Sequence, residues 1–342
     1  MAAPSGTPID ASFAALSDNL RADLPIARLE QYERVLKDLL AARMTSGLSG
    51  EEMRQVARFQ QSVGFLLKYK SYAIKASSPL GYSVFLQRPG EGFSFQRHVV
   101  HKTEIFYVLD VQPGGYVFIC EHDDWARLYQ RATFEAWLNG GAGPYEPFRY
   151  APARGDVIVI DKLNVVHTVV GCTLAEFATV STDMVDRLHD QNEGRSIAPE
   201  FTRAYAEQRL RAIRWPGASR YVRIAADGVT HTPIESERIV GGWRTTFGED
   251  RMIASAASFE PGAASAVTVD PIRAASVHVV EGKGRVLLGD AEERQRGALP
   301  AIEVSGGDLL LIPPGAHYGF VNDGPDVLKV AEHRIEAATA FI

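Results

Sequence analysis

The stretch "GFSFQRHVVHKTEIFYVLD", residues 92–110, decides the fold prediction because it joins ligand-type side chains to a strand pattern. Within nine positions it carries Gln96, His98, His101 and Glu104, and apolar residues then alternate as they do in a β-strand. Side chains alternate along a strand, so Gln96 and His98 share one face. A hairpin with the loop 99–103 would put His98 opposite Glu104. This alternation groups Gln96, His98 and Glu104, and it leaves His101 in the loop.

A further ligand should come from a distant strand, because a barrel interior brings strands together. The segment "GDVIVIDKLNVVHTVVG", residues 155–171, carries His167 inside an apolar strand. Two histidines, a carboxylate and an amide oxygen suit Zn²⁺ or another divalent first-row ion. Such a site can leave a position open for water or substrate. Other interpretations stay open: each histidine could be an ordinary core or rim residue, Gln96 could hydrogen-bond a ligand, and His101 could bend inward.

The rest of the chain reads as short strands with Gly and Pro turns, which predicts a mainly β protein of two jelly-roll barrels. Helical spacing appears at 27–44 and 50–69, before the strands begin. These helices could cover a barrel end, mediate dimerisation or close over substrate. The expected organisation is a helical lead-in (1–75), a metal-binding barrel (76–198) with a helical insertion (123–141), a connecting helix (199–215) and a second barrel (216–342).

Bulk properties exclude several classes of protein. The net charge of −6 comes without a Lys/Arg run, which argues against a nucleic-acid partner. The N-terminus lacks a basic region followed by an apolar one, and no window resembles a membrane span. The two cysteines, Cys120 and Cys172, are too few for a disulfide framework. We therefore expect a cytoplasmic protein without a membrane partner, acting on a small molecule, with a homodimer left open.

Four segments together resemble the cupin superfamily, and within it the class I mannose-6-phosphate isomerases. They are "QRH…KTEIFYVLDVQPGG", "GDVIVIDKLNVVH", "EFATVSTDMVDRLHDQNEGR" and the C-terminal "VHVVEGKGRVLLG…IEVSGGDLLLIPPGAHY". The similarity spans about residues 90–340, roughly three quarters of the chain. This chain differs from the family's pattern in having only five residues between His98 and Glu104.

The resemblance implies one divalent metal ion, with zinc first and Fe(II) or Mn as alternatives. It implies metal ligands at Gln96, His98, Glu104 and His167, a functional arginine at Arg187, and Lys102 as a polar residue of the pocket next to the metal. We expect Lys102 and Arg187 to be the catalytic cations. The implied reaction is aldose–ketose isomerisation of a carbohydrate through an enediol, in which a base moves a proton beside a polarised carbonyl. Lys102, His101 and His189 all remain candidates for that base.

Two other functions fit the same residues. A non-haem Fe(II) oxygenase uses two histidines and one carboxylate, which His98, His167 and Glu104 could supply. A non-catalytic sugar-binding barrel would hold an inert metal. In the second barrel, His317 follows a Pro/Gly turn, but His278 and Glu281 have opposite strand parity. A single histidine does not hold a metal, so we expect a metal-free, structural second barrel.

Overall fold

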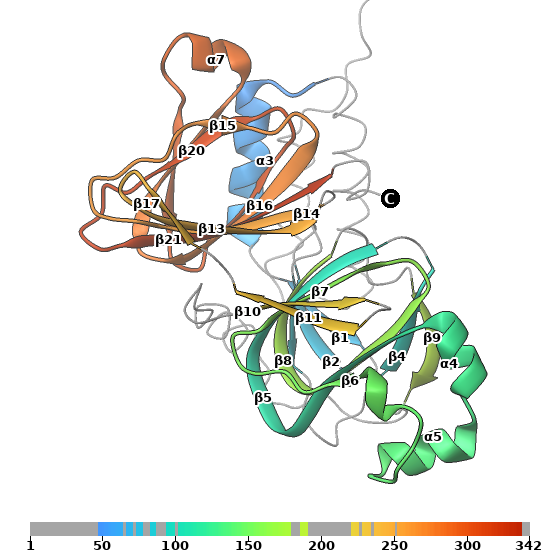
Figure 1. The fold of residues 1–342 in the computed structure, drawn as a ribbon. Coiled ribbons are helices and arrows are strands. Elements are labelled where there is room, and N and C mark those ends of the chain that lie inside the picture. The colour runs from blue at the N-terminus through green and yellow to red at the C-terminus, as the bar shows by residue number, and fades with distance from the viewer. Residues whose placement is uncertain are drawn as a thin grey trace, which may run out of the picture. The chain divides into compact units, whose positions relative to one another are not determined.

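The computed structural model describes residues 47–63, 66–70, 73–77, 83–86, 94–99, 102–178, 185–190, 220–225, 228–233, 236–249 and 252–336. They form two units, and apart from the parallel pairing of β10 with β7 the strands of each unit pair antiparallel (Figure 1). The expected mainly β architecture is confirmed. The helices predicted at 27–44 and 199–215 lie outside the described residues. Among the described helices, none is long and apolar enough to cross a membrane.

The described strands of the first unit form one 11-stranded sheet that folds back on itself. Its main path runs β1-β2-β3-β8-β5-β7-β10-β11, with β4, β6 and β9 attached at the side. The strands are β1 (Leu66–Lys70, at the boundary between the units), β2 (Ala73–Ser77), β3 (Ser83–Leu86), β4 (Ser94–His98), β5 (Lys102–Glu121), β6 (Arg149–Tyr150), β7 (Val157–Lys162), β8 (Val165–Ala178), β9 (Val185–Asp190), β10 (Arg220–Ala225) and β11 (Gly228–Pro233).

Two long strands, β5 and β8, turn this sheet into a barrel (Figure 1). Their pairing is interrupted between Val111 and Tyr116, where a Gln-Pro-Gly-Gly segment of β5 leaves the ladder. Each strand therefore takes part in two walls. The start of β5 pairs with β7 and with the end of β8, and the end of β5 pairs with the start of β8, beside β4. Bulges of this kind bend strands and close barrels.

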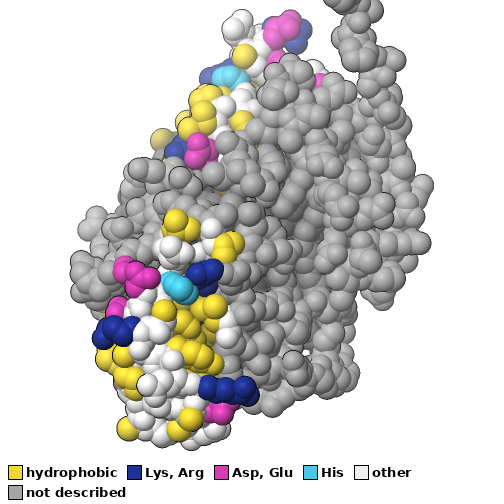
Figure 2. All heavy atoms as spheres, turned by 90° about the vertical axis from the view of Figure 1, so that its right-hand side faces the viewer, with side chains coloured by type: hydrophobic (Ala, Val, Ile, Leu, Met, Phe, Trp, Pro, Cys, Tyr) yellow, Lys and Arg dark blue, Asp and Glu magenta, His cyan; other side chains and the backbone are white. Residues whose placement is uncertain are grey.

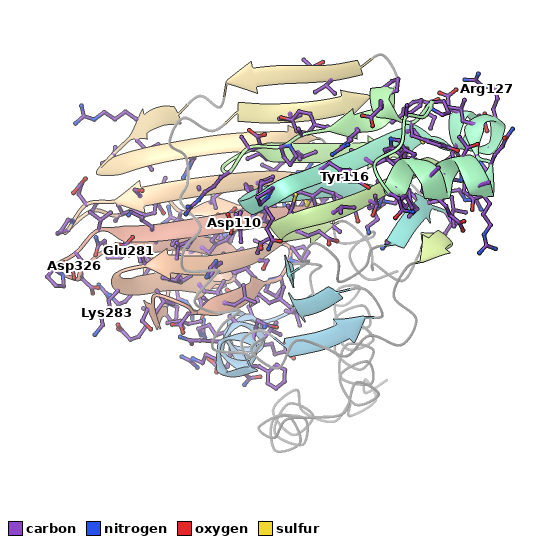
Figure 3. The ribbon with its side chains drawn as sticks, turned by 90° about the horizontal axis from the view of Figure 1, so that it is seen from below. Asp110, Tyr116, Arg127, Glu281, Lys283 and Asp326 are labelled. Carbon is purple, nitrogen blue, oxygen red and sulfur yellow. The ribbon has the colours of Figure 1, made fainter. Side chains whose placement is uncertain are left out.

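An aromatic cluster joins the outer face of one wall to the helical insertion, α4 (His122–Leu128) and α5 (Arg131–Leu138), which η1 (Glu146–Phe148) follows. Phe95 of β4 lies 5.2 Å from Trp125 and 4.8 Å from Phe134, ring centroid to ring centroid. Figure 3 shows Tyr116 beside these helices and Arg127 at their outer edge. Each such ring buries a large apolar area, so the helices are held by packing.

The second unit is a sandwich of two antiparallel sheets, in the orders β12-β13-β14-β21-β16-β19 and β15-β20-β17-β18. Side chains of both sheets fill the core between them. Figure 3 shows Glu281, Lys283 and Asp326 together at one end. The elements are β12 (Ser236–Ile239), β13 (Gly242–Glu249), β14 (Met252–Phe259), β15 (Thr268–Val269), β16 (Arg273–Glu281), β17 (Lys283–Gly289), α7 (Ala291–Gln295), β18 (Ala301–Ser305), β19 (Leu309–Ile312), β20 (His317–Val321) and β21 (Leu328–Glu336).

Helix α3 (Gly50–Val63) packs on the second unit, although it precedes the first unit in the chain. Its N-terminus is capped by Ser49, whose hydroxyl accepts from the amide of Glu52. Met53 and Ala57 enter the core between the two sheets. Arg54 donates to Glu293 beyond β17 and to the carbonyl of Leu288. Of the roles considered for the lead-in helices, α3 therefore covers a barrel.

The boundaries of the units differ from the predicted ones in three places. The helix predicted at 50–69 ends at Val63, and Leu66–Lys70 form strand β1. Strand β10, predicted in the second barrel, pairs in parallel with β7 of the first unit. In the sequence, the first unit is thus inserted between α3 and the strands of the second unit that α3 covers. On the face in Figure 2, the described hydrophobic and charged side chains are interspersed, as is usual for protein surfaces.

Candidate metal centre

Three buried side chains of the first unit converge at one point: His98, Glu104 and His167. The Nε2 atoms of the two histidines lie 3.0 Å apart. The Oε2 atom of Glu104 lies 3.2 Å from Nε2 of His98 and 3.3 Å from Nε2 of His167. The three atoms form a nearly equilateral triangle, which is the arrangement of three donors that face one ion.

The size of the triangle can be compared with that of a metal site. Donor atoms about 2.0–2.2 Å from a shared ion stand about 2.8–3.6 Å apart when they subtend 90–109° at it. All three separations, 3.0, 3.2 and 3.3 Å, fall in this range. Imidazole nitrogens and a carboxylate are also the donor types that zinc, iron and manganese accept. The residues therefore fit a divalent first-row ion.

Lys102 forms an ion pair with the second carboxylate oxygen of Glu104. Its ammonium pairs with Oε1 of Glu104, and both side chains are almost fully buried. Burial by itself raises the pKa of Glu104, but the charge of Lys102, with smaller contributions from the histidines, holds that pKa well below its ordinary value. Glu104 is thus a carboxylate whose Oε1 pairs with the ammonium of Lys102 and whose Oε2 is directed at the two histidines.

Gln96 lies beside the triangle. In the pairing of β4 with β8, Gln96 is directly opposite His167, so the two side chains leave the same face of the sheet. His98, two residues on, shares that face. Gln96 is buried. This placement is compatible with an amide oxygen as a fourth ligand.

The surroundings of His167 favour its neutral form. Burial lowers the pKa of His167 to about 3, and the nearby charges of His98 and Lys102 act in the same direction. Its ring lies 6.1 Å from that of Phe106, centroid to centroid. A neutral imidazole is the form that binds a metal.

The hairpin predicted between the strands of His98 and Glu104 is wrong for the described strands, although the residues it grouped do converge. Strand β4 pairs with β8 and β9, whereas β5 pairs with β6, β7 and β8. His98 and Glu104 are therefore not cross-strand neighbours. Gln96, His98 and His167 belong to one wall of the barrel, and Lys102 and Glu104 belong to the part of β5 that pairs with β7. The two groups meet across the interior.

The structure also brings in a residue that the sequence analysis missed, Glu176 on β8. It is buried and lies opposite Phe106 in the pairing of β5 with β8, so it faces the interior with Phe106 and Glu104. Strict alternation from His167 would send residue 176 to the outer face. Gly171, with φ of 65°, reverses the parity of the strand. A glycine inside a strand pattern was the available signal.

The remaining predicted residues are placed less completely. Arg187 is paired with Gln96 in the register of β4 with β9, which brings its backbone next to the triangle. His101 lies outside the described residues. In the second unit, His317 begins β20 and precedes Tyr318, which belongs to the core, so His317 points to the opposite side of its sheet.

Comparison with known proteins gives similarity of structure alone. No protein-family model matches the chain, and no curated protein matches it in sequence. Among solved structures, oxalate decarboxylase from Bacillus subtilis has a TM-score of 0.47 at 12% identity, over 80% of this chain and 74% of that one. The 11S globulin from Wrightia tinctoria has a TM-score of 0.48 at 12% identity, over 80% and 82%. Procruciferin, the 11S globulin from Brassica napus, has 0.47 at 12%, over 80% and 83%.

Proposed function

We propose that the first barrel is a metal-dependent isomerase that interconverts an aldose and a ketose, or similar hydroxy-carbonyl compounds, through an enediol. The observation that carries this proposal is the buried triangle of His98, Glu104 and His167 with Lys102 against Glu104. When bound, a divalent ion at this triangle would polarise the substrate carbonyl. Gln96 is the proposed fourth ligand, and zinc is the proposed metal, with Fe(II) or Mn as alternatives.

The isomerisation also needs a group that moves a proton between two neighbouring carbon atoms. We assign that role to Glu176, because it is a buried carboxylate on the interior face that also presents Glu104. Lys102 is less suited to act as a base, since its ammonium already pairs with Glu104. We therefore describe Lys102 as a positioning residue that keeps one oxygen of Glu104 directed at the histidines.

A cation beside the reacting carbons would stabilise the negative charge of the enediolate. Arg187 is the proposed cation, because the register of β4 with β9 puts it opposite Gln96. The likeness of the sequence to the mannose-6-phosphate isomerases supports a carbohydrate substrate. The connection between His98 and Glu104 is shorter than in that family, and we therefore expect the substrate to differ from the family's.

One observation favours a second candidate, a non-haem Fe(II) oxygenase. Two histidines and one carboxylate with their donor atoms at the corners of a small triangle are also the ligand set of that class. The two candidates differ in their need for dioxygen.

The experiment that tests the proposal is anaerobic turnover. The metal-loaded protein is incubated without oxygen with aldoses and ketoses in D₂O, and proton NMR follows deuterium at the carbon next to the carbonyl. We expect wild type to isomerise the substrate and to incorporate solvent deuterium at that carbon. We expect Glu176→Gln to retain the metal but to lose this activity. Substrate-dependent oxygen consumption with bound iron, and no anaerobic isomerisation, would support the oxygenase instead.

A further inference from the structure

The larger sheet of the second unit is buried on both faces along β14, β21, β16 and β19. Its inner face carries core residues such as Val277 and Val330. The opposite side of these four strands, the outer face, presents residues that are at most 5% exposed: Met252, Ala254, Ala256, Ala274, Ser276, His278, Leu309, Leu311, Ala331, His333 and Ile335. None of them belongs to the core clusters that the described residues form. An antiparallel sheet open to solvent would alternate apolar and polar side chains, so this face is built to be covered.

The outer face is shaped for close packing. Its centre consists mainly of small side chains, with Ala256 opposite Ala331 in the pairing of β14 with β21. Among the described side chains of these four strands, charge enters the face only at one end, where Lys329 pairs with Glu281 over 2.7 Å. A flat apolar sheet face is stabilised by burial under another element, most often a helix.

The polar side chains of the outer face are compatible with an apolar cover. They are Ser276, His278 and His333, and all three are buried. Burial, followed by the charge of His278, lowers the pKa of His333 well below its ordinary value, so His333 is neutral near pH 7.

Helix α3 has a second buried side next to this sheet. Met53 and Ala57 enter the core of the second unit, whereas Val56 and Phe59 lie on another side of the helix. Val56 and Phe59 are only 1% and 7% exposed, yet they too belong to none of the core clusters of the described residues. Because α3 packs against β19, the edge strand of the sheet, one element lying beside α3 can also reach the outer face.

The segment before α3 has the pattern of such an element. Residues 27–44 carry an apolar stripe at helical spacing: Leu29, Tyr32, Val35, Leu36, Leu39 and Leu40. Only residues 45–49 separate this segment from α3; Gly47 takes a φ of 77°, and Leu48 packs against the core of the second unit. Helices joined by so short a turn lie antiparallel as neighbours. A helix of this length would span about 27 Å, and the six strands of the sheet together span about 24 Å.

We propose that residues 27–44 form an amphipathic helix that folds back beside α3 and covers the outer face of the second unit with its apolar stripe. This helix would be a structural part of the second unit, and its role is independent of the isomerase proposed for the first. Its apolar stripe would then be occupied within the chain, which leaves it unavailable for dimerisation or for closing over a substrate.

The test asks whether a thiol on the outer face is protected by residues 27–44. Ala331→Cys places a thiol at the centre of the outer face, and Val330→Cys places one on the inner face of the same strand. Each full-length variant is treated with N-ethylmaleimide, and peptide mass spectrometry follows the new thiol, with the buried Cys120 and Cys172 as internal references. We expect both new thiols to react slowly.

Leu36→Asp puts a charge in the middle of the apolar stripe. It should speed labelling of Ala331→Cys at least about tenfold, because a carboxylate cannot stay buried against an apolar face. Labelling of Val330→Cys should remain slow. The matched control is Ala41→Asp, which adds the same charge on the opposite side of the predicted helix and should leave both rates unchanged.

Fast labelling of Ala331→Cys without any further change would overturn the proposal, as would equal rates with and without Leu36→Asp. Protection that is lost on dilution but not in Leu36→Asp would assign the outer face to a second copy of the chain. Should Leu36→Asp also expose Val330→Cys, the second unit has opened as a whole, and the milder Leu36→Ala decides. Faster labelling of Ala331→Cys alone would then support the proposal, and unchanged labelling would contradict it.

Discussion

The Nε2 atoms of His98 and His167 lie 3.0 Å apart inside the first barrel, and both side chains are buried. Two neutral imidazoles can share one hydrogen bond at this distance, but a carboxylate oxygen of Glu104 also lies within 3.3 Å of each. Three donors that turn toward a single point are better explained by a shared cation than by pairwise hydrogen bonds.

Glu104→Gln should reduce both metal binding and stability. The change keeps the shape of the side chain but leaves the buried charge of Lys102 without its partner. Breaking a buried pair in this way costs about 3–5 kcal/mol. Urea unfolding in EDTA measures this cost without any metal contribution. Glu303→Gln, an exposed change on β18, is the control, and equal stability of the two variants would contradict the account.

The aromatic cluster under the helical insertion should be a main source of stability in the first unit. Phe134 is fully buried and its ring lies 4.8 Å from that of Phe95. Phe134→Ala should therefore cost about 3–5 kcal/mol of unfolding free energy. Val240→Ala should cost almost nothing, because Val240 is 86% exposed. Denaturant unfolding compares the two, and a small loss in Phe134→Ala would show that the helices are not held by this packing.

Arg54 and Glu293 should be energetically coupled across α3 and the second barrel, since Arg54 Nη1 lies 2.8 Å from Glu293 Oε2. Arg54→Met removes the guanidinium that donates to the carbonyl of Leu288 and to the carboxylate of Glu293, which then accepts from the amide of Asp290 alone among its stated donors, and this costs about 1–3 kcal/mol. In a double-mutant cycle, Arg54→Met with Glu293→Met should cost less than the sum of the single changes. Strict additivity would mean that the contact does not hold α3 in place.

Glu332 should make the second barrel less stable as the pH rises. Its pKa in the fold is raised above the ordinary 4.5, mainly by burial. The folded state then holds its proton more tightly than the unfolded state, so the contribution is complete below pH 4.5 and is lost as the pH rises through the folded pKa. Glu332→Gln removes this dependence. Unfolding free energies measured from pH 4.5 upward should fall more steeply in wild type, and parallel curves would count against it.

The sequence allowed the β-rich architecture to be predicted, because strand periodicity and Gly/Pro turns repeat along the chain. Helix α3 was also predictable at its start, where Ser49 and Glu52 form a capping signal. Its end was not, because "FLLKY", residues 65–69, is a short apolar run that fits helix and strand equally well. The membership of β10 in the first unit depends on a parallel pairing with β7, which leaves no local pattern.

In the candidate site, the residue types were predictable and their geometry was not. His98, Glu104 and His167 were selected from ligand chemistry, but the hairpin that was to join two of them does not exist. They meet because β5 and β8 bend from one wall to the other. The inward position of Glu176 depends on the reversal of parity at Gly171. Bulges of this kind are set by tertiary packing, which strict alternation cannot anticipate.

The central claim is that His98, Glu104 and His167 hold one divalent metal ion. The most direct test is elemental analysis of the purified full-length protein beside His167→Ala and the control His317→Ala. We expect about one equivalent of metal in wild type and in His317→Ala, and almost none in His167→Ala. Metal-free wild type, or loss of the metal in His317→Ala with retention in His167→Ala, would contradict the account.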